Sequence, residues 1–274
     1  MKQPFFSIII PTLNEEKYLP NLLLALAKQH SPNFEVIVVD GHSQDKTIAV
    51  AKRFGTGFKH FQLLESPQTS LPYQRNFGAK HARGEWFIFI DADSVVMPYF
   101  IERISVFISN KSPQFFTTWS SSDSDVTSDA LLTLLNNMLI EGSTMVRRPF
   151  SPGPLTIVKK SVFEYIGGYD EARSFGEDQD FSQRLWEKGI KLEILRETMY
   201  VLSLRRFRKQ GTLKVLRIYM RGLLTVLFTK RVPRSIPGYL MGGHLYSAKR
   251  KKDETSLLRQ LERRLKLLIT ELFD

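Results

Sequence analysis

Short apolar runs alternate with longer amphipathic stretches through the first hundred residues. The run at residues 5–10 is almost wholly apolar, as expected of a strand covered on both faces, and further strands are predicted at residues 34–39, 60–64 and 86–90. Between them, apolar residues at helical spacing predict a helix that begins near Asn14 and helices over about residues 46–54 and 72–82. Pro11 and Thr12 are expected to end the first strand. This alternation predicts βαβ units and a mostly parallel sheet.

Ligands of such sheets bind at the carboxyl ends of the strands. In this sequence three polar segments follow predicted strands directly, at residues 11–14, 40–43 and 91–93. We therefore expect a binding site where these three segments meet.

The second half of the chain is less regular. A Ser/Asp-rich loop is predicted at 120–128 and a Pro/Gly-punctuated loop at 147–154, with helices at 130–139, 160–166 and 181–187. Short strands are predicted at 155–158, 192–195 and 200–204. The tail predicts two amphipathic helices, over residues 213–228 and 256–273, with a basic cluster at 249–252 between them.

Charge divides the chain into two parts. The 274 residues have a net charge of +11 and contain no cysteine, which excludes disulfides and thiolate metal sites. Residues 201–274 hold 18 of the 39 Lys and Arg but only 5 of the 28 Asp and Glu, a balance of +13, which leaves −2 for residues 1–200. The basic part favours an anionic partner: a membrane surface, nucleic acid or a phosphorylated acceptor. We see neither a signal-peptide pattern nor a membrane-spanning run, and expect a cytoplasmic location.

Two aspartates, Asp91 and Asp93, follow the fourth apolar run in FIFIDADS, residues 87–94. Two acids two positions apart at the end of a strand both lie near the edge of the sheet. Their oxygens suit Mg²⁺ or Mn²⁺, which bridge diphosphate oxygens. Aspartate is also common in turns at strand ends, so a purely structural turn remains the alternative.

Five motifs resemble, in order, those of the family 2, GT-A-fold glycosyltransferases. They are SIIIPTLNEEKYL (7–19), VIVVDGHSQDKT (36–47), QRNFGAKHARGEWFIFIDADS (74–94), IGGYDE (166–171) and GEDQDFSQRL (176–185). The resemblance covers roughly residues 5–200. It implies a Rossmann-like α/β fold with a mostly parallel sheet flanked by helices. It also implies transfer of a sugar from a nucleotide-diphosphate sugar to a hydroxyl acceptor, with inversion at the anomeric carbon.

The resemblance also implies roles for individual residues. The nucleotide sugar would be bound by Pro11, Thr12, Asn14, Glu15, Asp40, Arg75, Asp91 and Ala92. Asp91 and Asp93 would hold Mg²⁺ or Mn²⁺, Asp178 would be the catalytic base and Glu177 would lie on the acceptor side. Many relatives have paired acids after the second strand, whereas Gly41 follows Asp40 here, so the nucleotide stays open.

The proposed chemistry needs this set of groups. Negative charge develops on the leaving diphosphate and is neutralised by a cation, while a carboxylate opposite takes the proton of the acceptor hydroxyl. Acids at a helix N-terminus also stabilise the helix, which is the structural alternative for Glu177 and Asp178. Some relatives have a metal-binding histidine after the last strand. Arg205 and Arg206 stand there in this chain and could neutralise the diphosphate.

We expect a catalytic domain over residues 1–205 and a basic amphipathic helical extension over 206–274. The extension has two open interpretations. It attaches the protein to the anionic inner face of the cell membrane, near a lipid-linked or polysaccharide-precursor acceptor, or it packs on the catalytic domain or across a dimer.

Two other functions are weighed against sugar transfer. A sugar-1-phosphate nucleotidyltransferase is disfavoured because no Gly-rich phosphate loop follows the first strand. A non-catalytic module that binds a membrane surface or an anionic ligand leaves the acids at 91, 93, 177 and 178 unused. No nucleic-acid-binding signature is evident, so no nucleic-acid partner is expected.

Overall fold

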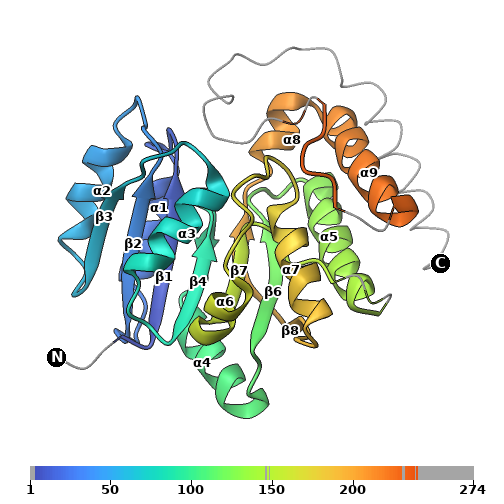
Figure 1. Cartoon of the computed structure of the whole chain (residues 1–274). Coiled ribbons are helices and arrows are strands. Elements are labelled where there is room, and N and C mark those ends of the chain that lie inside the picture. Colours follow the sequence, from blue (N-terminus) through green and yellow to red (C-terminus); the bar gives the residue numbers. More distant parts are fainter. Residues whose placement is uncertain (1–3, 146, 148, 230–231, 238, 240–274) are drawn as a thin grey trace, which may run out of the picture.

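The strands that the structure describes lie in a single sheet. A computed structural model describes residues 4–145, 147, 149–229, 232–237 and 239. Within these residues, eight strands have the order β3-β2-β1-β4-β7-β6-β8-β5. Their bounds are β1 Phe6–Thr12, β2 Phe34–Asp40, β3 Phe61–Glu65, β4 Trp86–Ile90, β5 Val95–Val96, β6 Phe115–Ser122, β7 Leu155–Lys159 and β8 Glu193–Leu202. Figure 1 shows this sheet running across the molecule between helices.

The N-terminal half of the sheet is parallel. β1 pairs in parallel with β2 and β4, and β2 with β3. β7 runs antiparallel between β4 and β6, β6 pairs in parallel with β8, and β5 pairs antiparallel with β8. The prediction of a mostly parallel α/β sheet flanked by helices is therefore confirmed, with β5 and β7 as its antiparallel strands.

Helices cover both faces of the sheet. Their bounds are α1 Leu19–Ala27, α2 Thr47–Gly55, α3 Leu71–His81, α4 Phe100–Lys111, α5 Thr127–Met145, α6 Lys160–Ile166, α7 Glu177–Glu187, α8 Arg205–Gln210 and α9 Thr212–Thr229. Helices α1, α2 and α4 pack on one face, and α3, α5, α6 and α7 on the other.

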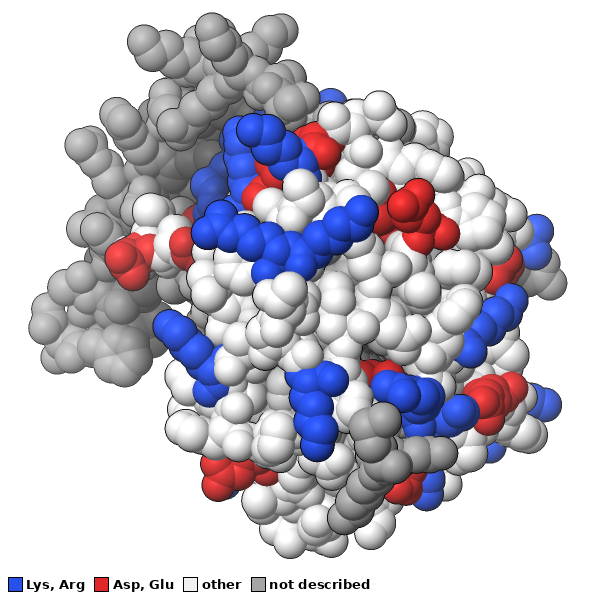
Figure 2. Space-filling model, turned by 90° about the vertical axis from the view of Figure 1, so that its left-hand side faces the viewer, with Lys and Arg blue, Asp and Glu red and all other residues white. Residues whose placement is uncertain are grey.

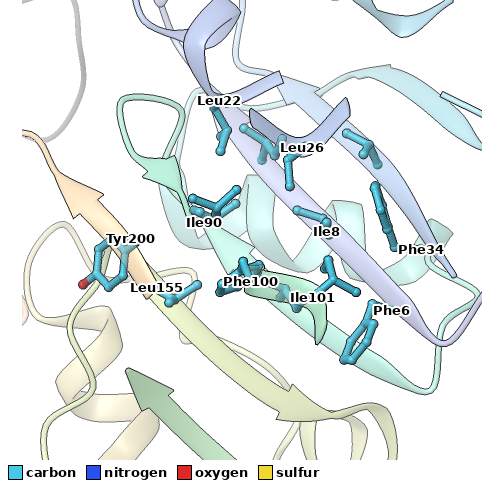
Figure 3. Packing of buried hydrophobic residues seen from close by; sticks show 14 of the residues in the cluster. Phe6, Ile8, Leu22, Leu26, Phe34, Ile90, Phe100, Ile101, Leu155 and Tyr200 are labelled. Carbon is cyan, nitrogen blue, oxygen red and sulfur yellow. The ribbon is translucent and has the colours of Figure 1, made fainter. Parts of the chain in front are cut away.

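The two cores follow from the alternation of side chains along each strand. Ile8 and Ile10 of β1 face the first core, whereas Ile9 between them faces the second, and all three are fully buried. In Figure 3, Leu22 and Leu26 of α1 point toward the sheet in the first core. A strand buried on both faces reads as a continuous apolar run, which is why β1, β2 and β4 were predictable.

The segment after β1 differs from the prediction. β1 extends through Thr12 instead of ending before Pro11, and the following helix begins at Leu19 rather than near Asn14. Asn14 has a φ of 56°, in the left-handed region, which a helix cannot contain. Pro20, in the first turn of α1, suits the start of a helix, so residues 13–18 form a turn at the carboxyl edge of the sheet.

The strands near the C-terminal edge also differ from the prediction. Residues 120–122, predicted as loop, are the end of β6, and the two late strands are one strand, β8. Ser120 pairs with Tyr200 across the two strands, so tertiary pairing overrides the weak strand propensity of serine. Polar Arg196 and Glu197 interrupt the apolar pattern of β8 because they form ion pairs with Glu141 and Arg103.

The basic tail is described only in part. The predicted helix at 213–228 is α9, whereas the cluster at 249–252 and the predicted helix at 256–273 lie outside the described residues. In the part of the chain that the structure describes, no helix has the length and apolar character to cross a bilayer.

Candidate functional site

Side-chain hydrogen bonds join the carboxyl ends of β1 and β2. The Thr12 hydroxyl donates to Asp40 Oδ1 at 3.0 Å, and the Ser43 amide donates to Asp40 Oδ2 at 2.8 Å. The Asn14 amide in turn donates to the Ser43 hydroxyl at 2.8 Å. Asp40 is 1% exposed and both its oxygens hold this turn, so three of the predicted nucleotide-binding residues form one connected loop structure.

Gln74 braces the same edge from α3. Its Nε2 donates to the carbonyl oxygens of Thr12 at 2.9 Å and Val39 at 2.8 Å, which ties together the ends of β1 and β2. Gly41 allows this approach, since a Cβ there would lie 2.8 Å from Gln74 Oε1. Pro11, another predicted nucleotide-binding residue, is buried in β1 opposite Val39.

Arg75 is the centre of the candidate site. Its side chain is fully buried, and its Nη2 lies 3.0 Å from Asp91 Oδ1 and 2.7 Å from the carbonyl oxygen of Gly153. Its Nη1 lies 3.2 Å from Glu177 Oε1. The guanidinium also lies over the Tyr169 ring, 5.2 Å from the centroid. Arg75 thus joins the end of β4 to the first residue of α7.

Asp178 lies beside this arginine at the N-terminus of α7. Gly176 precedes the helix with a φ of 65°, and the chain turns there into α7. A Cβ at Gly153 would lie 3.1 Å from Asp178 Oδ2 and 3.9 Å from Arg75 Nη2, so all three residues are close together. Burial, with a contribution from the charge of Glu177, raises the pKa of Asp178 to about 7. A carboxyl group with this pKa can accept a proton near neutral pH.

Asp93 is paired with Arg205, the first residue of α8. Arg205 Nε lies 2.7 Å from Asp93 Oδ2, and the two Nη atoms donate to the Glu15 carboxylate at 2.7 and 2.5 Å. Burial raises the pKa of Glu15 to about 7 and that of Asp93 to about 6, against the opposing effect of Arg205.

The predicted site residues therefore fall into three connected groups. Thr12, Asn14 and Asp40 share one loop network. The second group surrounds Arg75, which connects the end of β4 to α7, and the third surrounds Arg205, which connects Asp93 to the turn after β1. The side chain of Ala92 is buried in the first core at 3% exposure, so only its backbone can face a ligand. Asp180 lies apart, since it forms ion pairs with Arg173 and Arg184.

The pair Asp91 and Asp93 fits a divalent cation of the kind that phosphates help to hold. The described residues contain no group of three or more potential metal ligands. Magnesium in nucleotide sites commonly takes one or two carboxylates and completes its coordination with substrate phosphates and water. Asp91 lies close enough to Asp93 for its charge to raise the pKa of Asp93. The two side chains can therefore supply the protein's share of such a site.

Three residues of the site were missed in the sequence. Gln74 acts through carbonyl oxygens, Gly153 contributes its own carbonyl oxygen, and Tyr169 contributes an aromatic face. None of the three is acidic, whereas acidic residues were the feature that identified the strand ends as a candidate site. Gln74 directly precedes Arg75, and Tyr169 lies within the IGGYDE motif, so their positions were the available signal.

Known proteins resemble this chain in sequence and in fold. An uncharacterised glycosyltransferase of Haemophilus influenzae is 28% identical over 198 residues, which cover 66% of this chain and 62% of that protein. The chain thus spans less than two thirds of that relative's length.

Two solved structures share the fold. Staphylococcus aureus TarS in complex with UDP-GlcNAc matches with a TM-score of 0.60 at 24% identity, over 72% of this chain and 58% of that one. The mannosyltransferase PcManGT of Pyrobaculum calidifontis, in complex with GDP-Man and Mn²⁺, matches with a TM-score of 0.65 at 20% identity, over 85% of this chain and 67% of that one.

The family model of Glycosyl transferase family 2 matches residues 7–167. This range holds the ends of β1, β2 and β4, together with Arg75 and Gly153. Because the match covers more than half of the chain, the protein belongs to glycosyl transferase family 2.

Proposed function

We propose that this chain transfers a sugar from a nucleotide-diphosphate sugar to a hydroxyl acceptor, with inversion at the anomeric carbon. The observation that carries the proposal is the contact of one buried arginine, Arg75, with both Asp91 at the end of β4 and Glu177 at the start of α7. Relatives that bind UDP-GlcNAc and GDP-Man support a donor of this class.

Asp178 is the proposed base. Its pKa of about 7 leaves a large fraction of the group ionised at neutral pH, yet basic enough to take a proton from an attacking hydroxyl. Glu177, next to it, is held by Arg75 and lies on the proposed acceptor side. Asp178 is the second residue of α7, and its carboxylate is directed toward Gly153 and Arg75.

The proposed cation, Mg²⁺ or Mn²⁺, would be held by Asp91 and Asp93 and would neutralise charge on the leaving diphosphate. Thr12, Asn14, Asp40 and Glu15 would form or support the nucleotide side of the candidate site. Arg75 orients Asp91, because its Nη2 donates a hydrogen bond to Oδ1 of that carboxylate.

Donor screening and one substitution test this proposal. Thermal-shift measurements with UDP-, GDP-, CDP- and dTDP-sugars, with and without Mn²⁺, should find a donor that raises the melting temperature. With that donor, Asp178→Asn should keep donor binding and lose turnover by at least about a thousandfold. Asp180→Asn, two positions along the same helix, is the matched control and should keep turnover. An Asp178→Asn variant with wild-type turnover refutes the assignment.

The catalytic unit proposed here spans residues 1–205, and residues 206–274 form a basic extension that binds an anionic membrane surface. Residues 198–252 contain 14 Lys and Arg and no acidic residue. On α9, Lys214, Arg217 and Arg221 are exposed. The face of the molecule that includes α2 and β3 has a different pattern, with acidic and basic side chains interspersed (Figure 2).

Exposed apolar residues supply the second element of a membrane surface. Leu216 and Met220 of α9 are 41% and 52% exposed, and Met138 and Leu139 of α5 are 61% and 59% exposed. Basic side chains next to exposed apolar ones are typical of helices that lie in the lipid headgroup region. The proposed partner of this surface is an anionic membrane, which would also carry a lipid-linked acceptor.

Co-sedimentation with vesicles tests the membrane proposal. Wild-type protein should sediment with vesicles that contain anionic phospholipid and remain in solution with neutral ones. The double substitution Lys214→Glu/Arg217→Glu should abolish sedimentation, whereas Lys52→Glu/Arg53→Glu on α2 makes the same charge change elsewhere and should not. If both variants lose sedimentation equally, or if neither loses it, this surface does not bind the membrane.

A further inference from the structure

One arginine holds two acids of the site that are far apart in the sequence. Arg205, the first residue of α8, is 8% exposed. Its two Nη atoms donate hydrogen bonds to both carboxylate oxygens of Glu15, and its Nε forms an ion pair with Oδ2 of Asp93. The guanidinium also lies over the Tyr18 ring, 4.4 Å from the centroid. Contacts from two segments, the turn after β1 and the end of β4, fix this side chain in one position.

The position of the guanidinium is significant because Asp93 is one of the two proposed metal ligands. While Oδ2 of Asp93 accepts the hydrogen bond from Arg205 Nε, part of its charge is neutralised by the guanidinium, so Asp93 is a weaker ligand for a divalent cation. A cation bound to Asp93 would also lie close to the positive guanidinium, and the two would repel each other in a poorly solvated site. A divalent cation and Arg205 therefore compete for the same carboxylate.

We propose that Arg205 is a resident counter-cation of Asp93 and Glu15, which a divalent cation must displace from Asp93. This inference rests on the proposed function only in taking Asp91 and Asp93 as the metal ligands. In the metal-free protein the guanidinium offsets the repulsion among Glu15, Asp91 and Asp93. When a cation enters, Arg205 keeps its paired contacts with Glu15 and gives up the contact with Asp93.

A consequence concerns the order in which the ligands bind. A divalent cation alone meets the opposing charge of Arg205 and binds weakly. A cation that arrives together with a diphosphate brings negative oxygens, which offset the guanidinium. Arg205 thus favours entry of the cation together with the donor over entry of the cation alone.

The test measures binding of Mn²⁺ alone, from the decrease in the electron paramagnetic resonance signal of free Mn²⁺ during titration with the intact protein. Arg205→Gln should bind Mn²⁺ about tenfold more tightly than the wild type, which corresponds to about 1.4 kcal/mol. Arg205→Lys keeps the charge but cannot contact both carboxylates in the same way, and should show a smaller gain. Arg208→Gln is the matched control, because it removes the same charge from α8 but from contacts with Asp123 and Asp129.

Each outcome decides the question. Arg205→Lys decides it if Arg205→Gln does not fold, as judged by circular dichroism. The proposal is overturned if neither variant binds Mn²⁺ more tightly than the wild type, if no form of the protein binds Mn²⁺, or if Arg208→Gln gains as much affinity as Arg205→Gln. The measurement needs neither donor nor turnover, so absence of sugar transfer would overturn the proposed function and leave this inference intact.

Discussion

The raised pKa of Asp178 predicts that this residue costs the folded protein stability at neutral pH. The difference between its ordinary value of 3.8 and about 7 corresponds to about 4 kcal/mol at most. Asp178 is only partly buried and part of the effect comes from the charge of Glu177, so we expect a destabilisation of about 2 kcal/mol. Asp178→Asn removes the ionisable group and keeps an oxygen for the Gln179 amide, which now donates to Oδ1 at 2.8 Å.

The sign follows from the order in which the two states ionise. Below about pH 4 the carboxyl group is protonated in both the folded and the unfolded chain, and the wild type loses nothing through this residue. Between about pH 4 and 7 the unfolded chain ionises first, so the wild type becomes progressively less stable than Asp178→Asn. Above about pH 7 both states are ionised and the difference stays constant.

Thermal unfolding followed by circular dichroism from pH 4.5 to 8.5 measures this difference. At pH 8 Asp178→Asn should melt about 5 °C higher than the wild type, and the gap should shrink toward pH 4.5. Asp125→Asn, at an exposed position, controls for the loss of a carboxylate. A gap that does not change with pH, or a wild type that is more stable throughout, would refute the assignment of a raised pKa to Asp178.

Three further predictions follow from the same contacts. Arg75→Met leaves Asp91 and Glu177 without their buried partner and should lower the free energy of unfolding in urea by about 3–5 kcal/mol, whereas Arg103→Met, which breaks an exposed pair, should leave the urea midpoint nearly unchanged. The initial rate of sugar transfer should rise about tenfold per pH unit below about pH 7 and level off above it, because Asp178 must be ionised to act as base; a rate that falls over this range contradicts that role. Chelation with EDTA should abolish transfer, and Mn²⁺ or Mg²⁺ should restore it, while the melting temperature of the donor-free protein stays unchanged; a lower melting temperature would indicate a structural ion.

The parts of the fold that were predictable are those whose local sequence agrees with the tertiary structure. β4 and α6 have the predicted bounds, since a fully apolar run and a helix closed by a glycine pair leave few alternatives. β8 was split because Arg196 and Glu197 look like a break, although partners on α5 and α4 satisfy their charges. The start of α1 was wrong because one residue, Asn14, adopts a left-handed conformation that the helical pattern does not reveal.

The connections of the site could not be predicted for a different reason. Arg75 and Glu177 are 102 positions apart, and Arg205 and Glu15 are 190 apart. A sequence identifies acids at strand ends, but it does not show which cation neutralises them. Arg205 illustrates this, because it belongs to a basic segment whose composition favours an external anionic partner, whereas its own side chain points inward onto Glu15 and Asp93.

The charges gathered in the candidate site do not balance. Within the described residues, two buried arginines lie among five carboxyl groups, those of Glu15, Asp91, Asp93, Glu177 and Asp178. If all five are ionised, the two arginines neutralise two negative charges and three remain. Burial, together with repulsion between neighbouring carboxylates, raises the pKa of Glu15, Asp93 and Asp178. Such a site gains from any added positive charge, so a divalent cation should bind more tightly as pH rises from about 6 to 8. Affinity for Mn²⁺ that stayed constant over this range would mean that the acids do not compete with protons for the cation, and that the site is not the anionic centre described here.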